Sequence, residues 1–171
     1  ATYGSRNNFP DFKESVGLDL SEEDLIVIQS YAQAIEKIYE EKRRLEGYVK
    51  TSVRELMPNS SCLIDELLLA KMIASAGSIE RLARLSASSI QLIGAEKALF
   101  RHLRKQGKSP KFGMIFLSSW IQASTDDQKG KVARILSAKL MQSIRIDFYS
   151  GRDESQRIRK ELEDEIKKAD R

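Results

Sequence analysis

Residues 91–104 read QLIGAEKALFRHLR, a stretch that turns at Gly94 and then continues as a helix with two different faces. One face is cationic, because its three basic residues recur at i, i+4 and i+7. These residues are Lys97, Arg101 and Arg104. Leu99 and Leu103 fall on another face, where we expect them to anchor the helix to a core. The pattern fits either a helix that docks an anionic partner or an ordinary solvated amphipathic helix.

The basic residues of the chain are concentrated around this helix. Residues 91–145 contain eleven lysine or arginine residues and three acidic ones, whereas the whole chain has a net charge of +4. The rest of the chain is therefore net acidic. Segregation of charge into a basic block indicates a polyanionic partner for that block.

Composition favours an all-α protein that works in a reducing compartment. The 171 residues are 41% hydrophobic and 32% charged, with only three prolines and nine glycines. A single cysteine, Cys62, excludes an internal disulfide and a cysteine-based zinc cluster. No apolar run has the length of a membrane span, and no signal peptide is recognisable, so no membrane partner is expected.

The pattern from residue 21 to 58 predicts a long coiled-coil arm. Ser21 and Asp24 resemble a helix-opening capping box, and Pro58 stops the helix. Between them, a register of alternating steps of three and four runs over about four heptads, with polar Lys42 and Ser52 at two of its positions and apolar residues at the others. The apolar residues are Ile28, Tyr31, Ile35, Ile38, Leu45, Val49 and Leu56. A seam of this length needs a partner helix, which favours self-association.

Further helices are expected on both sides of the basic block. They cover residues 61–76, 79–85 and 125–149, and Arg145 in the last one is expected to pair with a carboxylate. Trp120 is expected in the core, although stacking on unpaired bases is an alternative. The predicted organisation is an irregular lead-in (1–20), the arm (21–58), a compact helical domain (59–151) and a charged, solvated C-terminal helix or tail (152–171).

The sequence offers no support for an enzyme. His102 is the only histidine, and it has neither a metal-ligand constellation nor a visible nucleophile partner. No Walker loop or dinucleotide-binding fingerprint is present. Cys62 reads as a packing residue. We expect no catalytic residue, no metal and no cofactor.

Three motifs resemble the signature of the Nop domain family, in the order found in that family. They are the run from Ser88 to Arg101 (SSIQLIGAEKALFR), the run from Lys111 to Phe116 (KFGMIF), and the run from Lys129 to Lys139 (KGKVARILSAK) followed by Arg145-Ile146-Asp147. The resemblance covers about residues 17–150. It implies a coiled-coil arm followed by a compact helical Nop domain.

The resemblance also implies partners. The family comprises the archaeal core protein of C/D-box guide ribonucleoproteins, its nucleolar relatives and a spliceosomal relative. Such a domain binds a kink-turn RNA together with the small protein seated on it. Family members recruit fibrillarin, a methyltransferase, through an N-terminal domain that this sequence lacks, so the chain resembles a fragment. Localisation would be cytoplasmic in an archaeon and nucleolar or nuclear in a eukaryote.

Charge pattern and resemblance together give nine candidate RNA-binding residues. They are Lys97, Arg101, Arg104, Lys108, Lys111, Lys129, Lys131, Arg134 and Lys139. Four further motif residues are expected to touch either the partner protein or the backbone of the fold itself. They are Gln91, Gly94, Ala95 and Glu96. Asp126 and Asp127 depart from the family pattern, because relatives often carry proline and basic or amide residues there, and two carboxylates would repel a phosphate.

Three functions remain open at this point. The leading one is a scaffold of a C/D-box guide ribonucleoprotein, favoured by the GAEKALFR run. The second is a spliceosomal Nop protein that binds a different RNA in the same way. The third is a helical adaptor that works through its coiled coil alone, with the basic block as ordinary surface. Salt dependence separates the first two from the third, because phosphate binding weakens steeply with salt.

Overall fold

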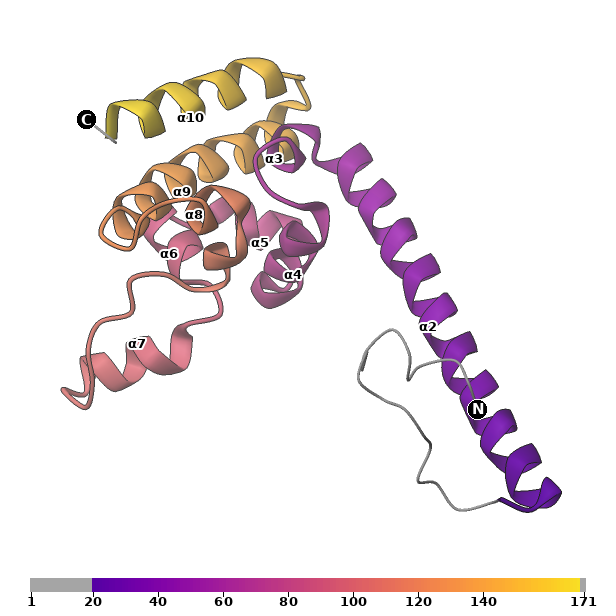
Figure 1. Cartoon of the computed structure of the whole chain (residues 1–171). Helices are drawn as coiled ribbons and strands as arrows, with labels where there is room; N and C mark the ends of the chain where they lie inside the picture. Colours follow the sequence, from indigo (N-terminus) through magenta and orange to yellow (C-terminus); the bar gives the residue numbers. More distant parts are fainter. Residues whose placement is uncertain (1–19, 170–171) are drawn as a thin grey trace. The chain divides into compact units, whose positions relative to one another are not determined.

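The computed structural model describes residues 20–169, and every regular element in this range is a helix (Figure 1). The all-α class predicted from the sequence is therefore confirmed. The chain divides into two compact units, Ala1–Arg43 and Arg44–Arg171, and we call the second unit the body. The elements are α2 (Glu22–Leu56), α3 (Pro58–Ser61), α4 (Glu66–Ala76), α5 (Ile79–Arg84), α6 (Ala87–Leu92), α7 (Glu96–Leu103), η1 (Met114–Leu117), α8 (Ser119–Gln122), α9 (Lys129–Arg145), η2 (Ile146–Ser150) and α10 (Ser155–Ala169).

Helix α2 starts at the predicted capping box. The backbone N–H of Asp24 donates to Ser21 Oγ over 3.1 Å, and three acidic residues occupy the first turn, where they favour the positive end of the helix dipole. The expected irregular lead-in lies outside the described residues, apart from Leu20.

Most of the heptad seam of α2 is exposed to solvent. Ile28 is 52% exposed, Tyr31 72% and Ile38 69%, whereas Val49 is partly buried against the core. An apolar stripe on a long helix usually packs against a core or another helix. The helix predicted for this segment is confirmed, and its pairing into a coiled coil remains a prediction.

Two short turns connect α2 to the body. Met57 is completely buried, and Pro58 ends α2 while opening α3, where its missing N–H costs nothing. The single helix expected from residue 61 to 76 is wrong in its first part, because the chain turns again before Asp65. The carboxylate of Asp65 then accepts hydrogen bonds from the N–H groups of Leu67 and Leu68, which starts α4.

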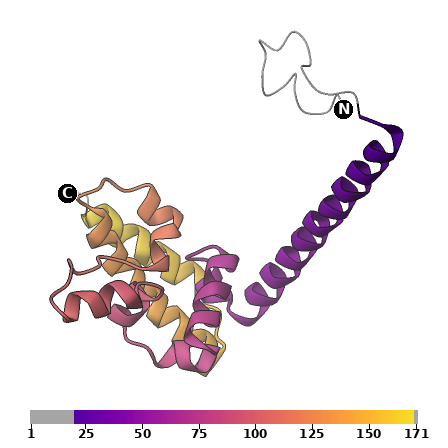
Figure 2. The same cartoon turned by 90° about the horizontal axis from the view of Figure 1, so that it is seen from below.

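Helix α9 lies at the centre of the body, packed against α5, α6, α8 and α10 (Figure 2). Its apolar residues face several neighbours at once, as expected from their spread around the helix axis. Trp120 from α8 is half-buried, and its indole N–H donates to the carbonyl of Leu63 over 2.7 Å. The core position predicted for this residue is confirmed.

The C-terminal helix is part of the core and is not a solvated tail. Ile158 is 1% exposed and Leu162 is fully buried, and both lie on the side of α10 that packs against α9. The prediction of solvation overlooked a narrow apolar stripe. Ile158, Leu162 and Ile166 recur every four residues among charges of both signs, so one side of the helix is apolar. The predicted helix itself is confirmed.

The end of α9 also differs in detail from expectation. The α-helix stops at Arg145, and one π-turn (Ile146–Ser150) follows before Gly151 reverses the chain with a φ of 63°. Arg145 was expected to pair with a carboxylate, but its guanidinium donates to the carbonyl oxygens of Ala83 and Leu85. These carbonyls at the end of α5 lack helical partners, which explains the need for a donor.

No helix in the described part of the chain is both long and apolar enough to cross a membrane.

Candidate nucleic-acid interface

Helix α7 presents the three predicted cations together. Lys97, Arg101 and Arg104 are all exposed, and they line one open hollow of about 540 Å³ with Phe100 and Gln106. Among the described residues, none of the three cations has an acidic partner. We call these three residues the cation face. Unpaired guanidinium and ammonium groups converging on one hollow are suited to bind phosphate oxygens.

The expected anchoring of α7 by its leucines holds for Leu99, which is partly buried, and fails at the end of the helix. Leu103 is 67% exposed and Phe100 is 62% exposed, and no residue of α7 is fully buried. Figure 1 shows α7 extending away from the other helices of the body. The chain leaves α7 through a long turn to Phe112, so only the start of the helix is held against the body. The apolar side chains near its end therefore stay uncovered.

Two motif residues around the start of α7 form hydrogen bonds with the backbone of the domain itself. The side-chain amide of Gln91 donates to the carbonyl of Lys111 over 2.7 Å, and Glu96 Oε1 accepts the N–H of Gly94 over 2.7 Å. Gly94 has a φ of 85°, a conformation that favours glycine, and Ala95 occupies the position before α7. Of the two roles left open for these residues, the structure supports the backbone role for Gln91 and Glu96.

Backbone hydrogen bonds fasten the second motif to the first. The N–H of Gly113 donates to the carbonyl of Gln91 over 2.8 Å, and the N–H of Met114 donates to that of Ile93 over 2.7 Å. The backbone of Lys111 is held by the Gln91 side chain at its own carbonyl and by the bonds of Gly113 just after it, while its side chain is exposed. The first two family motifs form one structural unit that carries α7 and Lys111.

A second cationic cluster lies where Lys111 approaches the start of α9. Lys129 Nζ is 2.6 Å from Asp126 Oδ1 and 5.7 Å from the centre of the Phe116 ring. The hydrogen bond from Lys129, together with its charge and a smaller contribution from Lys111, lowers the pKa of Asp126 below its usual value. Sequence analysis did not assign Phe116 a role. Its spacing from Lys111 in the motif was the available signal.

The other predicted cations differ in whether they are free to contact a phosphate. Lys108 and Arg134 are exposed and have no side-chain partner within the described range. Lys131 is exposed but donates to the carbonyl of Ala169 over 2.8 Å, which ties the start of α9 to the end of α10. Lys131 can therefore meet a phosphate only by leaving this contact.

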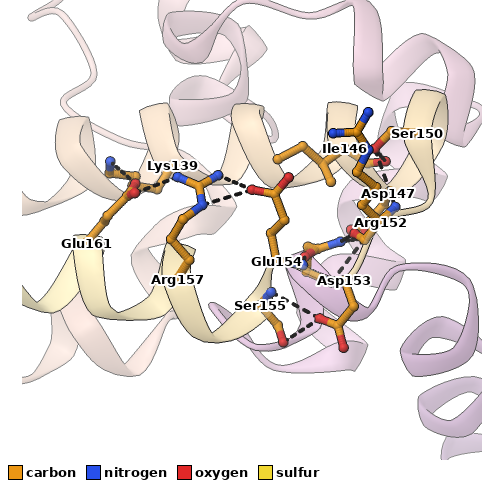
Figure 3. Close-up of polar contacts among 11 residues, drawn as sticks. Lys139, Ile146, Asp147, Ser150, Arg152, Asp153, Glu154, Ser155, Arg157 and Glu161 are labelled. Carbon is orange, nitrogen blue, oxygen red and sulfur yellow. Dashed lines mark hydrogen bonds and ion pairs between the residues drawn. The ribbon is translucent and has the colours of Figure 1, made fainter.

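Lys139 is better explained by a structural role than by RNA contact. It is 9% exposed, and its ammonium lies 3.0 Å from Glu161 (Figure 3) and 2.8 Å from Glu165, both on α10. Burial lowers the pKa of Lys139, but hydrogen bonds to the two carboxylates outweigh it and leave the pKa above its usual value. This bridge joins α9 to α10, so we leave Lys139 out of the proposed surface.

No group of histidine, cysteine or acidic side chains in residues 20–169 has the arrangement of a metal site. Cys62 is half-buried, and its thiol donates to the carbonyl of Asn59 over 3.0 Å. Burial, with help from nearby Asp147 and Asp153, raises the pKa of Cys62 to about 11. A thiol with such a pKa is a packing group and a poor nucleophile at neutral pH.

We expect Cys62 to react slowly with iodoacetamide. Because its pKa is raised, the thiolate forms only near pH 11, so alkylation of the folded protein at pH 8 is expected to be roughly a hundredfold slower than in denaturant. Mass spectrometry over time measures both rates. Equal rates in the two conditions would contradict the raised pKa.

Comparison with known proteins shows which family this sequence matches. Residues 7–169 match the Nop family model, which is described as "snoRNA binding domain, fibrillarin". The chain is 41% identical to nucleolar protein 58 of Aspergillus oryzae over 140 residues, covering 82% of this chain and 24% of that protein. It is 36% identical to nucleolar protein 56 of Mus musculus over 157 residues, covering 90% of this chain and 27% of that protein.

A solved structure also resembles the chain. The crystal structure of a fibrillarin/Nop5p complex superposes with a TM-score of 0.66 at 33% sequence identity, over 86% of this chain and 56% of that one. The chain spans about a quarter of the length of the nucleolar relatives it matches. The family match extends over nearly all of the sequence and includes the helices that form the candidate interface. The chain belongs to the Nop family.

Proposed function

We propose that this chain is the RNA-binding scaffold of a C/D-box guide ribonucleoprotein, in which guide RNAs direct 2′-O-methylation. In this proposal it recognises a kink-turn RNA together with the small protein bound to that RNA. It acts by binding and holding its partners, and the chemistry belongs to another subunit. The matching family description, which names snoRNA binding, supports this class of ligand.

The observation that carries the proposal is the cation face of α7. Lys97, Arg101 and Arg104 are exposed and line the same hollow, without an acidic partner among the described side chains. Lys139, by contrast, is already paired with two carboxylates of α10. Three cations that remain unpaired on one face are available to neutralise RNA phosphates.

The side chains beside the cation face support a composite target. Phe100 and Leu103 expose large apolar surfaces next to the cations, although burial of such surfaces is normally favourable. RNA phosphates offer nothing apolar to cover them. A partner made of RNA and protein could contact the cations through its phosphates and cover the apolar side chains with its protein part. This supports recognition of an RNA that already carries a protein.

The exposed seam of α2 supports self-association as a second property of the chain. Ile28, Ile35 and Leu45 remain between 43% and 52% exposed. A second helix with a matching seam would bury these residues in knobs-into-holes packing. We propose that this helix belongs to a second scaffold protein or to another part of the same assembly.

Further proposals rest on the relatives. The relatives from Aspergillus oryzae and Mus musculus are both named nucleolar proteins, so we propose a nucleolar location, which imaging of a fluorescent fusion would test. The solved relative Nop5p is in a complex with fibrillarin, so we propose fibrillarin as an assembly partner. The same nucleolar names favour a guide ribonucleoprotein over a spliceosomal particle.

A gel shift tests the central proposal. The chain is mixed with a kink-turn RNA, with and without the kink-turn-binding protein, at two salt concentrations. We expect an additional shift only when that protein is present, and we expect higher salt to weaken it. Absence of any shift would favour the adaptor function instead, in which α2 alone makes the contacts.

We expect Arg101→Ala and Arg134→Ala each to weaken ternary assembly by about three- to tenfold and to reduce the salt slope by about one. Both side chains are exposed, so the melting temperature is expected to change little. Arg84→Ala is the matched control, because Arg84 is an exposed arginine of α5 that pairs with Glu80 outside the proposed surface. Wild-type affinity in both test variants would remove these residues from the interface.

A further inference from the structure

Asp126 pairs with one lysine of the proposed RNA surface and feels the charge of a second. Its carboxylate contacts Lys129 Nζ at 2.6 Å, and the charge of Lys111 also acts on it. The side chain of Asp126 is 94% exposed, whereas that of Lys129 is only 20% exposed. The carboxylate that pairs with the Lys129 ammonium is therefore open to solvent, where a competing anion can reach it.

Aromatic packing connects the segment that carries Lys111 to Lys129. Phe112, which follows Lys111, stacks on Phe116 with ring centres 4.8 Å apart and an interplanar angle of 11°. Lys129 lies over the other partner of this stack, with its ammonium 5.7 Å from the Phe116 ring centre. The stack thus links the residue that follows Lys111 to the ring beneath Lys129, and we call Lys111 and Lys129 the lysine pair.

The carboxylate of Asp126, paired with Lys129 and within reach of the charge of Lys111, occupies a place that a phosphate could take. Carboxylate and phosphate both offer anionic oxygens to ammonium donors at similar distances. A phosphate that binds the lysine pair must displace Asp126 or approach its negative charge closely. Either event costs free energy, and an exposed ion pair of this kind is weak enough to be displaced.

We propose that Asp126 competes with RNA phosphate for the lysine pair, and that this competition lowers the affinity of the surface for RNA. This inference rests on the proposed RNA-binding function and adds a regulating residue to it. It gives a role to one of the two carboxylates that depart from the family pattern at the edge of a basic surface. RNA binding then requires exchange of one anion for another, so weakly held RNA is disfavoured.

The test compares two adjacent substitutions with the same change in charge. Asp126→Asn removes the competing carboxylate. Asp127→Asn is the matched control, since Asp127 is exposed and forms no hydrogen bond or ion pair with any described residue. Binding to the kink-turn RNA that carries its small protein is measured by gel shift at several salt concentrations.

We expect Asp126→Asn to tighten binding by about two- to fivefold, because the competing ion pair is lost. The salt slope should steepen by about one, since one more phosphate contact forms without opposition. Asp127→Asn should raise affinity less and leave the slope unchanged. In a Lys129→Ala background, Asp126→Asn should gain no more than Asp127→Asn does.

Several outcomes overturn the proposal. Equal gains from the two substitutions would show a general effect of net charge, and weaker binding by Asp126→Asn would show that the carboxylate helps to hold the site together. Persistence of the gain without Lys129 would remove the lysine from the mechanism. If wild type and all variants fail to bind RNA in a salt-dependent way, the proposed function itself is wrong and the inference falls with it.

Discussion

Asp147→Ala is expected to lower the free energy of unfolding of the body by about 3–5 kcal/mol. Asp147 follows α9 and is the meeting point of four hydrogen-bond donors from α3. Its Oδ1 accepts from the backbone N–H of Asn59 at 3.0 Å and from the side-chain amide at 2.7 Å. Its Oδ2 accepts from the N–H of Ser60 at 2.9 Å and from the hydroxyl at 2.7 Å.

The cost is high because the donors have no access to water. Asn59 and Ser60 are both completely buried, so removal of the carboxylate leaves polar groups without an acceptor. Asn59 also links this cluster to the start of α10. Its Oδ1 accepts the N–H of Glu154 and its amide donates to the carbonyl of Arg152, which lies beside Asp147 in Figure 3. One carboxylate thus joins the junction after α2 to the turn between α9 and α10.

Urea unfolding followed by the fluorescence of Trp120 measures the effect on the body. Asp147→Asn is expected to be intermediate, because it keeps one carbonyl oxygen but places an amide against the remaining donors. Asp164→Asn, at an exposed position of α10, is the control and should change stability by less than about 0.5 kcal/mol. A loss below about 1 kcal/mol for Asp147→Ala would mean that water or a shifted side chain replaces the carboxylate.

The helices with strong local signals were predictable from the sequence. A capping residue, a helix-stopping proline and a long apolar period define α2, and Gly77 ends α4 with a φ of 93° as its position suggests. Prediction failed where contacts between distant parts of the chain determine the local structure or the burial of a helix. Asp65, a typical N-cap residue, was the one local signal for the turn before α4, and it was overlooked. The stripe that buries α10 is hidden by its many charges.

The candidate site was predictable in part, because charge is visible in sequence and pairing is not. The spacing of Lys97, Arg101 and Arg104 correctly placed them on one face of α7. Lys139 has the same chemistry, but its partners Glu161 and Glu165 lie on another helix, more than twenty residues along the chain. Only a fold reveals which cations already have a carboxylate. Whether the unpaired ones bind RNA remains a prediction.

Gly113→Ala is expected to destabilise the body by about 3–5 kcal/mol and to disrupt the surface around Lys111. A Cβ atom at this position would lie 2.0 Å from the carbonyl oxygen of Ile93 and 2.8 Å from its carbonyl carbon. Both are backbone atoms, so no side-chain rotation relieves the clash. The backbone must move, and the hydrogen bonds that Gly113 and Met114 donate to Gln91 and Ile93 are then lost.

Gly130→Ala is the control, and it should have the opposite sign. No atom lies within 4 Å of the position a Cβ would take at Gly130, and the residue is inside α9. Alanine is favoured over glycine in a helix by up to about 1 kcal/mol, so this variant should be slightly stabilised. Urea unfolding of both variants, followed by Trp120 fluorescence, compares the two glycines on one scale.

The effect of Gly113→Ala on RNA binding distinguishes a packing role of this segment from a role in positioning Lys111. Lys111 lies two residues before Gly113, and its carbonyl accepts the amide of Gln91, so movement of the backbone moves the lysine as well. At temperatures where the variant is still folded, we therefore expect weaker RNA binding with a smaller salt slope. Wild-type binding by a destabilised variant would show that the glycine serves packing alone, and wild-type stability would contradict the close approach to Ile93.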